Sequence, residues 1–134
     1  MAGSSAELHE DPAQLSEGTI DRHRAIVSLM EELEAVDWYD QRVEATTDES
    51  LAELLAHNRD EEKEHAAMNL EWLRRHDPGL DEQLRTYLFT DRPLLTVEEA
   101  SEDGTDEDPA EGHRLPTNGP SGLGIGGMKG LESP

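Results

Sequence analysis

A glutamate and a histidine one helical turn apart, Glu62 and His65, stand in a stretch of sequence with helical periodicity. At about 100° per residue, apolar residues lie within about 40° of Glu62 around such a helix. These residues are Leu51, Leu55, Ala66 and Leu73. The same arithmetic places Glu32 among Ala25, Leu29, Val36, Tyr39 and Val43 of a preceding helical stretch. The sequence therefore predicts carboxylates and an imidazole on two buried helix faces.

These carboxylates need a partner, because burying an unpaired carboxylate costs several kcal/mol unless it is protonated, paired or bound to a metal. Arg59 could reach Glu62, but no other Lys or Arg is an evident partner on either face. Carboxylate and imidazole ligands together suit iron, manganese or zinc. A Glu-x-x-His motif in isolation also recurs by chance on acidic helix surfaces, so its metal interpretation depends on the matching Glu32.

The ligands on this chain make half of a di-metal site. In ferritin-like di-iron bundles, two helices supply one Glu each and the other two supply Glu-x-x-His each. This chain has two long helical stretches with Glu32, Glu62 and His65. Two copies packed face to face would complete the set and cover the apolar stripes, so the sequence predicts a homo-oligomer of dimers.

Further side chains near Glu32 have open interpretations. Tyr39 lies close to Glu32 around the helix, so its hydroxyl could hydrogen-bond and orient a ligand carboxylate. Packing is the alternative role for Tyr39 and for the neighbouring Trp38. Glu31 and Glu34, one turn apart on a different side, could form an outer cation site that guides iron inward, or a solvated face.

Composition excludes several classes of function. The 134-residue chain has 32 Asp and Glu against 11 Lys and Arg, a net charge of −21, which repels nucleic acid and anionic membrane surfaces. It has no cysteine, so disulfides and thiolate chemistry are excluded. There is no signal-peptide core and no run of about 18 apolar residues, so a cytoplasmic location is expected.

Capping and breaker residues predict an all-α protein. A first helix is expected from near Asp11-Pro12 to Ala45, and a second from the 46–50 break to Asp77-Pro78-Gly79. Thr46, Thr47 and Asp48 could each cap the second helix. A short third helix follows, from Leu80 to about Phe89. Short connections predict an antiparallel two-helix hairpin, which forms a ferritin-like four-helix bundle on dimerisation.

The chain is thus divided into four predicted segments. Residues 1–12 form a flexible N-terminus and residues 13–90 the helical hairpin domain. Residues 91–121 form a disordered acidic linker, because they are too polar to build a core. Residues 122–134 contain spaced apolar residues among glycines, a pattern typical of a peptide that docks into another protein's groove, with a simple flexible end as the alternative.

Residues 15–90 resemble the encapsulated ferritins. The segments that carry the resemblance are Met30 to Arg42, His57 to Met68 and Leu84 to Thr90. The resemblance implies a two-helix protomer, a ring-shaped decamer of dimers and a di-iron ferroxidase centre between subunits. It also implies Glu32, Glu62 and His65 as iron ligands, with Tyr39 and Trp38 beside them and Glu31 and Glu34 as an outer iron site.

The segment Leu123 to Leu131 is similar to the peptides that load cargo into encapsulin shells. The expected function is therefore a ferroxidase that oxidises Fe(II) with dioxygen and delivers iron for storage inside an encapsulin nanocompartment. The alternative is a non-enzymatic helical module that binds metal to fix its assembly, or an adaptor tethered to a shell by its tail.

Overall fold

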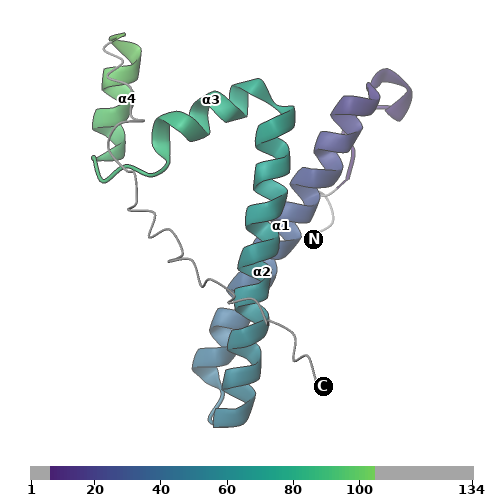
Figure 1. Ribbon diagram of the computed structural model, residues 1–134. Coiled ribbons are helices and arrows are strands. Elements are labelled where there is room, and N and C mark those ends of the chain that lie inside the picture. Colours follow the sequence, from purple (N-terminus) through teal and green to yellow (C-terminus); the bar gives the residue numbers. More distant parts are fainter. Residues whose placement is uncertain (1–6, 105–134) are drawn as a thin grey trace, which may run out of the picture. The chain divides into compact units, whose positions relative to one another are not determined.

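The computed structural model describes residues 7–104, and every regular element in this range is helical (Figure 1). Two long helices, α1 (Glu17–Ala45) and α2 (Glu49–His76), lie against each other and form a hairpin. A short α3 (Pro78–Tyr87) packs on α2. The all-α hairpin with a third helix is therefore confirmed. Phe89 begins a second unit, of which the structure describes residues 89–104.

The start of α1 lies later than predicted. Asp11 and Pro12 do begin a helical turn, but it is the short 3-10 turn η1 (Pro12–Gln14), in which the Asp11 side chain accepts a hydrogen bond from the Ala13 amide at 2.9 Å. Leu15 is extended, and Ser16 then caps α1 by accepting from the Thr19 amide at 3.2 Å. Asp11 and Ser16 are both favourable N-cap residues, and the long helix begins after Ser16.

The turn between α1 and α2 resolves the three candidate caps in favour of Asp48. Its carboxylate accepts from the Leu51 amide at 2.9 Å and from the Ser50 hydroxyl at 2.6 Å. These hydrogen bonds, with the one from Ser50 foremost, hold the pKa of Asp48 below its usual value. Helix α1 ends at Ala45, with Thr46 as its C-cap, so only three residues separate the helices and α2 must return antiparallel beside α1 (Figure 1).

The corner between α2 and α3 is also capped by a carboxylate. Asp77 accepts from the Leu80 amide at 3.1 Å, and Pro78 occupies the first position of α3, where a missing amide hydrogen costs nothing. The helix therefore begins two residues before the predicted Leu80, and it ends at Tyr87 rather than near Phe89.

The second unit contains a helix where the sequence predicts a linker. Helix α4 (Leu94–Glu102) occupies part of the segment 91–121. A low content of apolar residues predicted disorder there, yet Leu94 to Glu102 is rich in good helix formers and directly follows Pro93. Residues 105–121 lie outside the described residues, as do residues 1–6 and the predicted docking peptide at 122–134.

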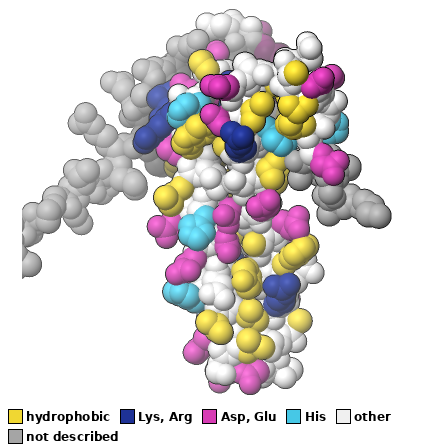
Figure 2. Space-filling view, turned by 90° about the vertical axis from the view of Figure 1, so that its right-hand side faces the viewer, with side chains coloured by type: hydrophobic (Ala, Val, Ile, Leu, Met, Phe, Trp, Pro, Cys, Tyr) yellow, Lys and Arg dark blue, Asp and Glu magenta, His cyan; other side chains and the backbone are white. Residues whose placement is uncertain are grey.

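The hairpin has very little interior of its own. Among the described residues, the only buried apolar side chains are Ala66 and Leu73 of α2 and Val97 of α4. Large apolar side chains along α1 and α2 remain exposed: Ile26, Met30, Leu33, Trp38, Leu51, Leu54, Met68 and Trp72. Figure 2 shows apolar side chains in a row along the lower part of one face, with acidic and histidine side chains beside them.

Within residues 7–104, no helix has both the length and the apolar character that a membrane crossing requires.

Candidate metal centre

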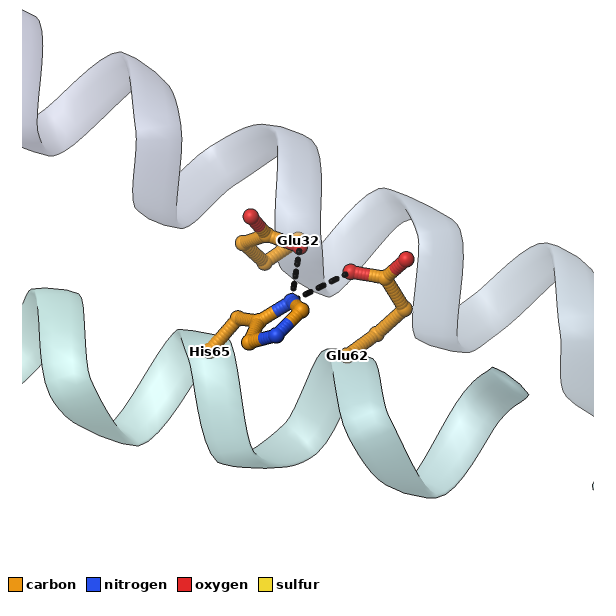
Figure 3. Close-up of side chains that lie close together, drawn as sticks. All are labelled: Glu32, Glu62 and His65. Atoms are coloured by element: carbon orange, nitrogen blue, oxygen red, sulfur yellow. Dashed lines mark ion pairs between the residues drawn. The ribbon is translucent and has the colours of Figure 1, made fainter. Parts of the chain in front are cut away.

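Glu32 of α1 and Glu62 and His65 of α2 converge between the two long helices (Figure 3). Each contributes one potential ligand atom, and the three atoms lie within 4.8 Å of one another. The Nδ1 atom of His65 is 3.4 Å from Oε2 of Glu62 and 3.8 Å from Oε2 of Glu32. In the described part of the chain this is the one group of at least three acidic or histidine side chains close enough to share an ion.

The hairpin explains why these three meet. Glu62 and His65 are three residues apart on α2 and so lie one turn apart on nearly the same side. The antiparallel return brings Glu32 opposite them, and the small buried Ala66 marks this side of α2 as inward-facing. The side chains of Glu32 and Glu62 are only 26% and 25% exposed, against 51% for His65. The carboxylates are therefore partly desolvated, as expected for a polar site in a helix seam.

The two carboxyl groups shift each other's pKa in opposite directions, which favours a proton on Glu32. Hydrogen bonding with Glu62, followed by partial burial, raises the pKa of Glu32 above its ordinary 4.5. The same hydrogen bond, assisted by one with His65, lowers the pKa of Glu62. Two carboxylates this close cannot both ionise freely, so they titrate as a pair. A bound cation would relieve the same repulsion in place of that proton.

Arg59 does not fill this role, although the sequence allowed it to pair with Glu62. Its guanidinium is 3.0 Å from Asp40 of α1 and 3.2 Å from Asp60. Hydrogen bonds with Asp60 and then Asp40 raise the pKa of Arg59. Within the described residues no Lys or Arg forms an ion pair with Glu32 or Glu62. In this part of the chain, no Lys or Arg therefore compensates the negative charge of Glu32 and Glu62.

Asp40 is the residue that sequence reasoning missed at this site. It lies 19 residues before Arg59 and shares no short motif with it. The available signal was indirect: Arg59 lies three residues before Glu62 on α2, and a hairpin with its turn near residue 47 brings the second half of α1 beside it.

The three side chains fit a metal ion such as iron. Carboxylate oxygen and imidazole nitrogen suit iron, manganese and zinc. Bonds of about 2.0–2.2 Å place two ligand atoms of one ion at most about 4.4 Å apart, so a separation within 4.8 Å needs only a small side-chain rotation. Three ligands from one chain leave coordination positions open, and a second copy could supply three more.

The remaining predicted residues lie on α1 near this group. Tyr39 is half-buried, and the Arg42 guanidinium lies 5.6 Å from its ring centre and 6.0 Å from that of Trp38. Glu31 and Glu34 are exposed and lie outside the three-residue group. The hydrogen bond from Tyr39 to a ligand carboxylate, and the outer cation site at Glu31 and Glu34, stay predictions.

Fold and side chains together define a helical-hairpin protein with a candidate carboxylate–imidazole metal site. The chain belongs to the EncFtn-like family, whose model matches residues 7–91. Membership of this ferritin-like family indicates an iron-related function.

Known relatives cover most of the chain. It is 58% identical over 132 residues to an "Encapsulated ferritin-like protein" of Rhodospirillum rubrum, which spans 97% of this chain and 93% of that protein. It is 55% identical over 100 residues to a "Ferritin-like protein" of Thermotoga maritima, covering 75% of this chain and 88% of the relative. The crystal structure of protein ne0167 from Nitrosomonas europaea matches with a TM-score of 0.63 and 61% identity, covering 65% of this chain and 96% of that one.

Proposed function

We propose that two copies of this chain form a ferroxidase centre, which oxidises Fe(II) to Fe(III) with dioxygen. The observation that carries the proposal is the convergence of Glu32, Glu62 and His65 in the helix seam with no Lys or Arg to neutralise the carboxylates. A cation is the partner that this arrangement lacks. Family membership makes iron the cation to test first.

A dimer accounts for a second observation, the exposed apolar side chains of the hairpin. A single copy leaves Ile26, Leu33 and Met68 exposed, although each is expected in a protein interior. Pairing two hairpins would bury such surfaces and would bring together four carboxylates and two imidazoles. We propose a ring-shaped decamer as the full assembly, built from these dimers.

In this proposal iron is the substrate. The carboxylates of Glu32 and Glu62 hold Fe(II), while the neutral imidazole of His65 completes each set. Each of two Fe(II) ions loses one electron, and dioxygen accepts both. Flexible carboxylates accommodate the change in charge, and the half-exposed position of His65 leaves a route for the Fe(III) product to depart.

Tyr39, Glu31 and Glu34 have supporting roles in this proposal. Tyr39 orients a ligand carboxylate through its hydroxyl, and its half-buried position on α1 is compatible with that role. The exposed Glu31 and Glu34 attract Fe(II) at the surface and pass it to the site, which suits a protein with a net charge of −21.

Oxygen consumption during Fe(II) addition tests the ferroxidase centre. Glu32→Ala and His65→Ala should each slow oxidation at least about tenfold, because each copy then lacks a ligand. Glu53→Gln, an exposed glutamate change on α2, is the control and should match the parent. Parent-like oxidation by either alanine variant would show that these side chains do not bind the iron that reacts.

The rival function is metal binding that only fixes the assembly. It predicts the same buried ligands and the same oligomer but no turnover. The discriminating measurement is the amount of Fe(III) formed when Fe(II) is added in excess. An enzyme oxidises far more iron than its sites hold, whereas a structural site stops once it is filled.

The oligomer is tested by the mass of the purified protein with and without a chelator, together with metal analysis. The double variant Ile26→Glu with Leu33→Glu, one helix face charged at two exposed positions, should reduce the mass to that of a single chain. Unchanged mass in this variant would place the subunit interface elsewhere.

We also propose that residues 122–134 dock on an encapsulin shell, so that iron is stored inside it. Support comes from the name of the Rhodospirillum rubrum relative, which matches 97% of this chain. Deletion of residues 122–134 should abolish co-purification with a co-expressed encapsulin, while oxidation of Fe(II) by the isolated protein persists. Co-purification of the shortened chain at the parent level would refute the docking role.

A further inference from the structure

Arg59 is the arginine placed to compete with a metal ion for Glu62 in the described part of the chain. The two residues are three positions apart on α2, and side chains at that spacing are neighbours on a helix surface. An Arg–Glu ion pair there would compensate the carboxylate without any metal. A nearby guanidinium would also repel an approaching divalent cation.

The structure shows Arg59 held in another direction. Nη1 donates to Asp40 on α1 at 3.0 Å, and Nε donates to Asp60 at 3.2 Å. The Arg59 side chain is 23% exposed, whereas its partners Asp40 and Asp60 are 54% and 63% exposed. Asp60 also lies 3.5 Å from Lys63, which directly follows Glu62.

We propose that Asp40 and Asp60 act as positioning residues that hold the Arg59 guanidinium away from Glu62 and thereby keep Glu62 free to bind Fe(II). Asp40 is the cross-helix part of this device, because it reaches Arg59 only once the hairpin has formed. The inference rests on the proposed function insofar as it takes Glu62 as an iron ligand. Asp40, Asp60 and Arg59 thus affect iron binding without being iron ligands themselves.

The test is a double-mutant cycle measured by calorimetric titration of the full-length protein with Fe(II) under anaerobic conditions. Asp40→Asn removes the cross-helix contact of Arg59, so that only Asp60 restrains it, and should weaken Fe(II) binding about two- to fivefold. Arg59→Gln alone should change the affinity by less than about 1.5-fold, and so should the double variant, because the competitor is then gone.

Asp37→Asn is the matched control for the loss of one negative charge. Asp37 is an exposed carboxylate of the same helix, and its partner is the Gln41 amide at 3.2 Å rather than Arg59. It should leave the affinity within about 1.5-fold of the parent at physiological salt. An equal loss in Asp37→Asn and Asp40→Asn would reduce the effect to net charge and overturn the proposal.

The double variant separates this role from simple bracing of the hairpin. If Asp40 only ties α1 to α2, removing Arg59 as well cannot restore binding, and failure of the double variant to recover would overturn the proposal. So would parent-like binding in Asp40→Asn. Melting curves of all variants provide the folding control.

The proposed ferroxidase function can fail separately. If the parent protein binds Fe(II) but never oxidises it, the ferroxidase function is refuted, while the double-mutant cycle still tests the role of Asp40. If the parent protein binds no Fe(II), Glu62 is not an iron ligand and both proposals are overturned.

Discussion

Helix α2 carries two groups of carboxylates in opposite electrostatic settings. At its C-terminal corner, Glu71 contacts Arg74 at 2.7 Å and Arg75 at 3.0 Å, and Asp81 of α3 binds Arg74 and Arg85. The first of these contacts, a hydrogen bond from Arg74, is the main reason that the pKa of Glu71 is lowered to about 2. Glu71 and Asp81 at this corner each have a guanidinium beside them.

The centre of the same helix lacks such cations. Glu62 faces Glu32 and a half-exposed His65, and the pKa of Glu32 is raised rather than lowered. Arginines thus neutralise Glu71 and Asp81 at the corner, whereas the partly buried pair Glu32 and Glu62 has no Lys or Arg partner among the described residues. A metal ion between Glu32 and Glu62 would supply the missing charge.

The largest difference between the two groups is expected when the same substitution is made in each of them. Glu62→Gln should lower Fe(II) affinity and the oxidation rate by at least about tenfold, since an amide is a poorer ligand than a carboxylate. Glu71→Gln makes the same chemical change nine residues further along α2, about 13 Å from Glu62 by helix geometry. It should leave Fe(II) binding as in the parent, measured by anaerobic titration and oxygen uptake.

The raised pKa of Glu32 gives a second, smaller test based on pH. A raised pKa for Glu32 means that its protonated form stabilises the metal-free protein, and this contribution is lost as the pH rises through that raised value. Fe(II) must displace the proton, so its affinity should rise over the same interval. The increase in melting temperature on anaerobic Fe(II) addition should therefore be larger at neutral pH than near pH 4.5. An increase independent of pH would refute proton displacement.

The smallest expected effect is the acid sensitivity of the corner. Because the pKa of Glu71 is lowered from 4.5 to about 2, its ion pairs add stability above pH 4.5 that disappears as the pH falls toward 2. Glu71→Gln should lower the melting temperature by a few degrees at neutral pH and by nothing near pH 2. A constant difference across this range would mean that Glu71 stabilises the corner by packing instead.

Much of this architecture could be predicted from local sequence. The Asp77-Pro78 signal fixed the end of α2, because an Asp cap and a proline in the first turn suit only a new helix. The start of α1 was wrong, because Asp11 and Ser16 are both good caps and periodicity does not rank them. Helix α4 was missed because acidic composition suggested disorder, while glutamate is itself a good helix former.

For the candidate site, helical periodicity was sufficient to predict which side chains lie on the facing sides of α1 and α2. A turn of 3.6 residues places Glu62 and His65 together, and the short turn after Ala45 returns α2 beside Glu32. The hydrogen-bond partner of Arg59, in contrast, follows from the packing of the two helices. Its choice between Glu62, one turn away, and Asp40, on the other helix, depends on the distance between two helices, and local periodicity does not contain that distance.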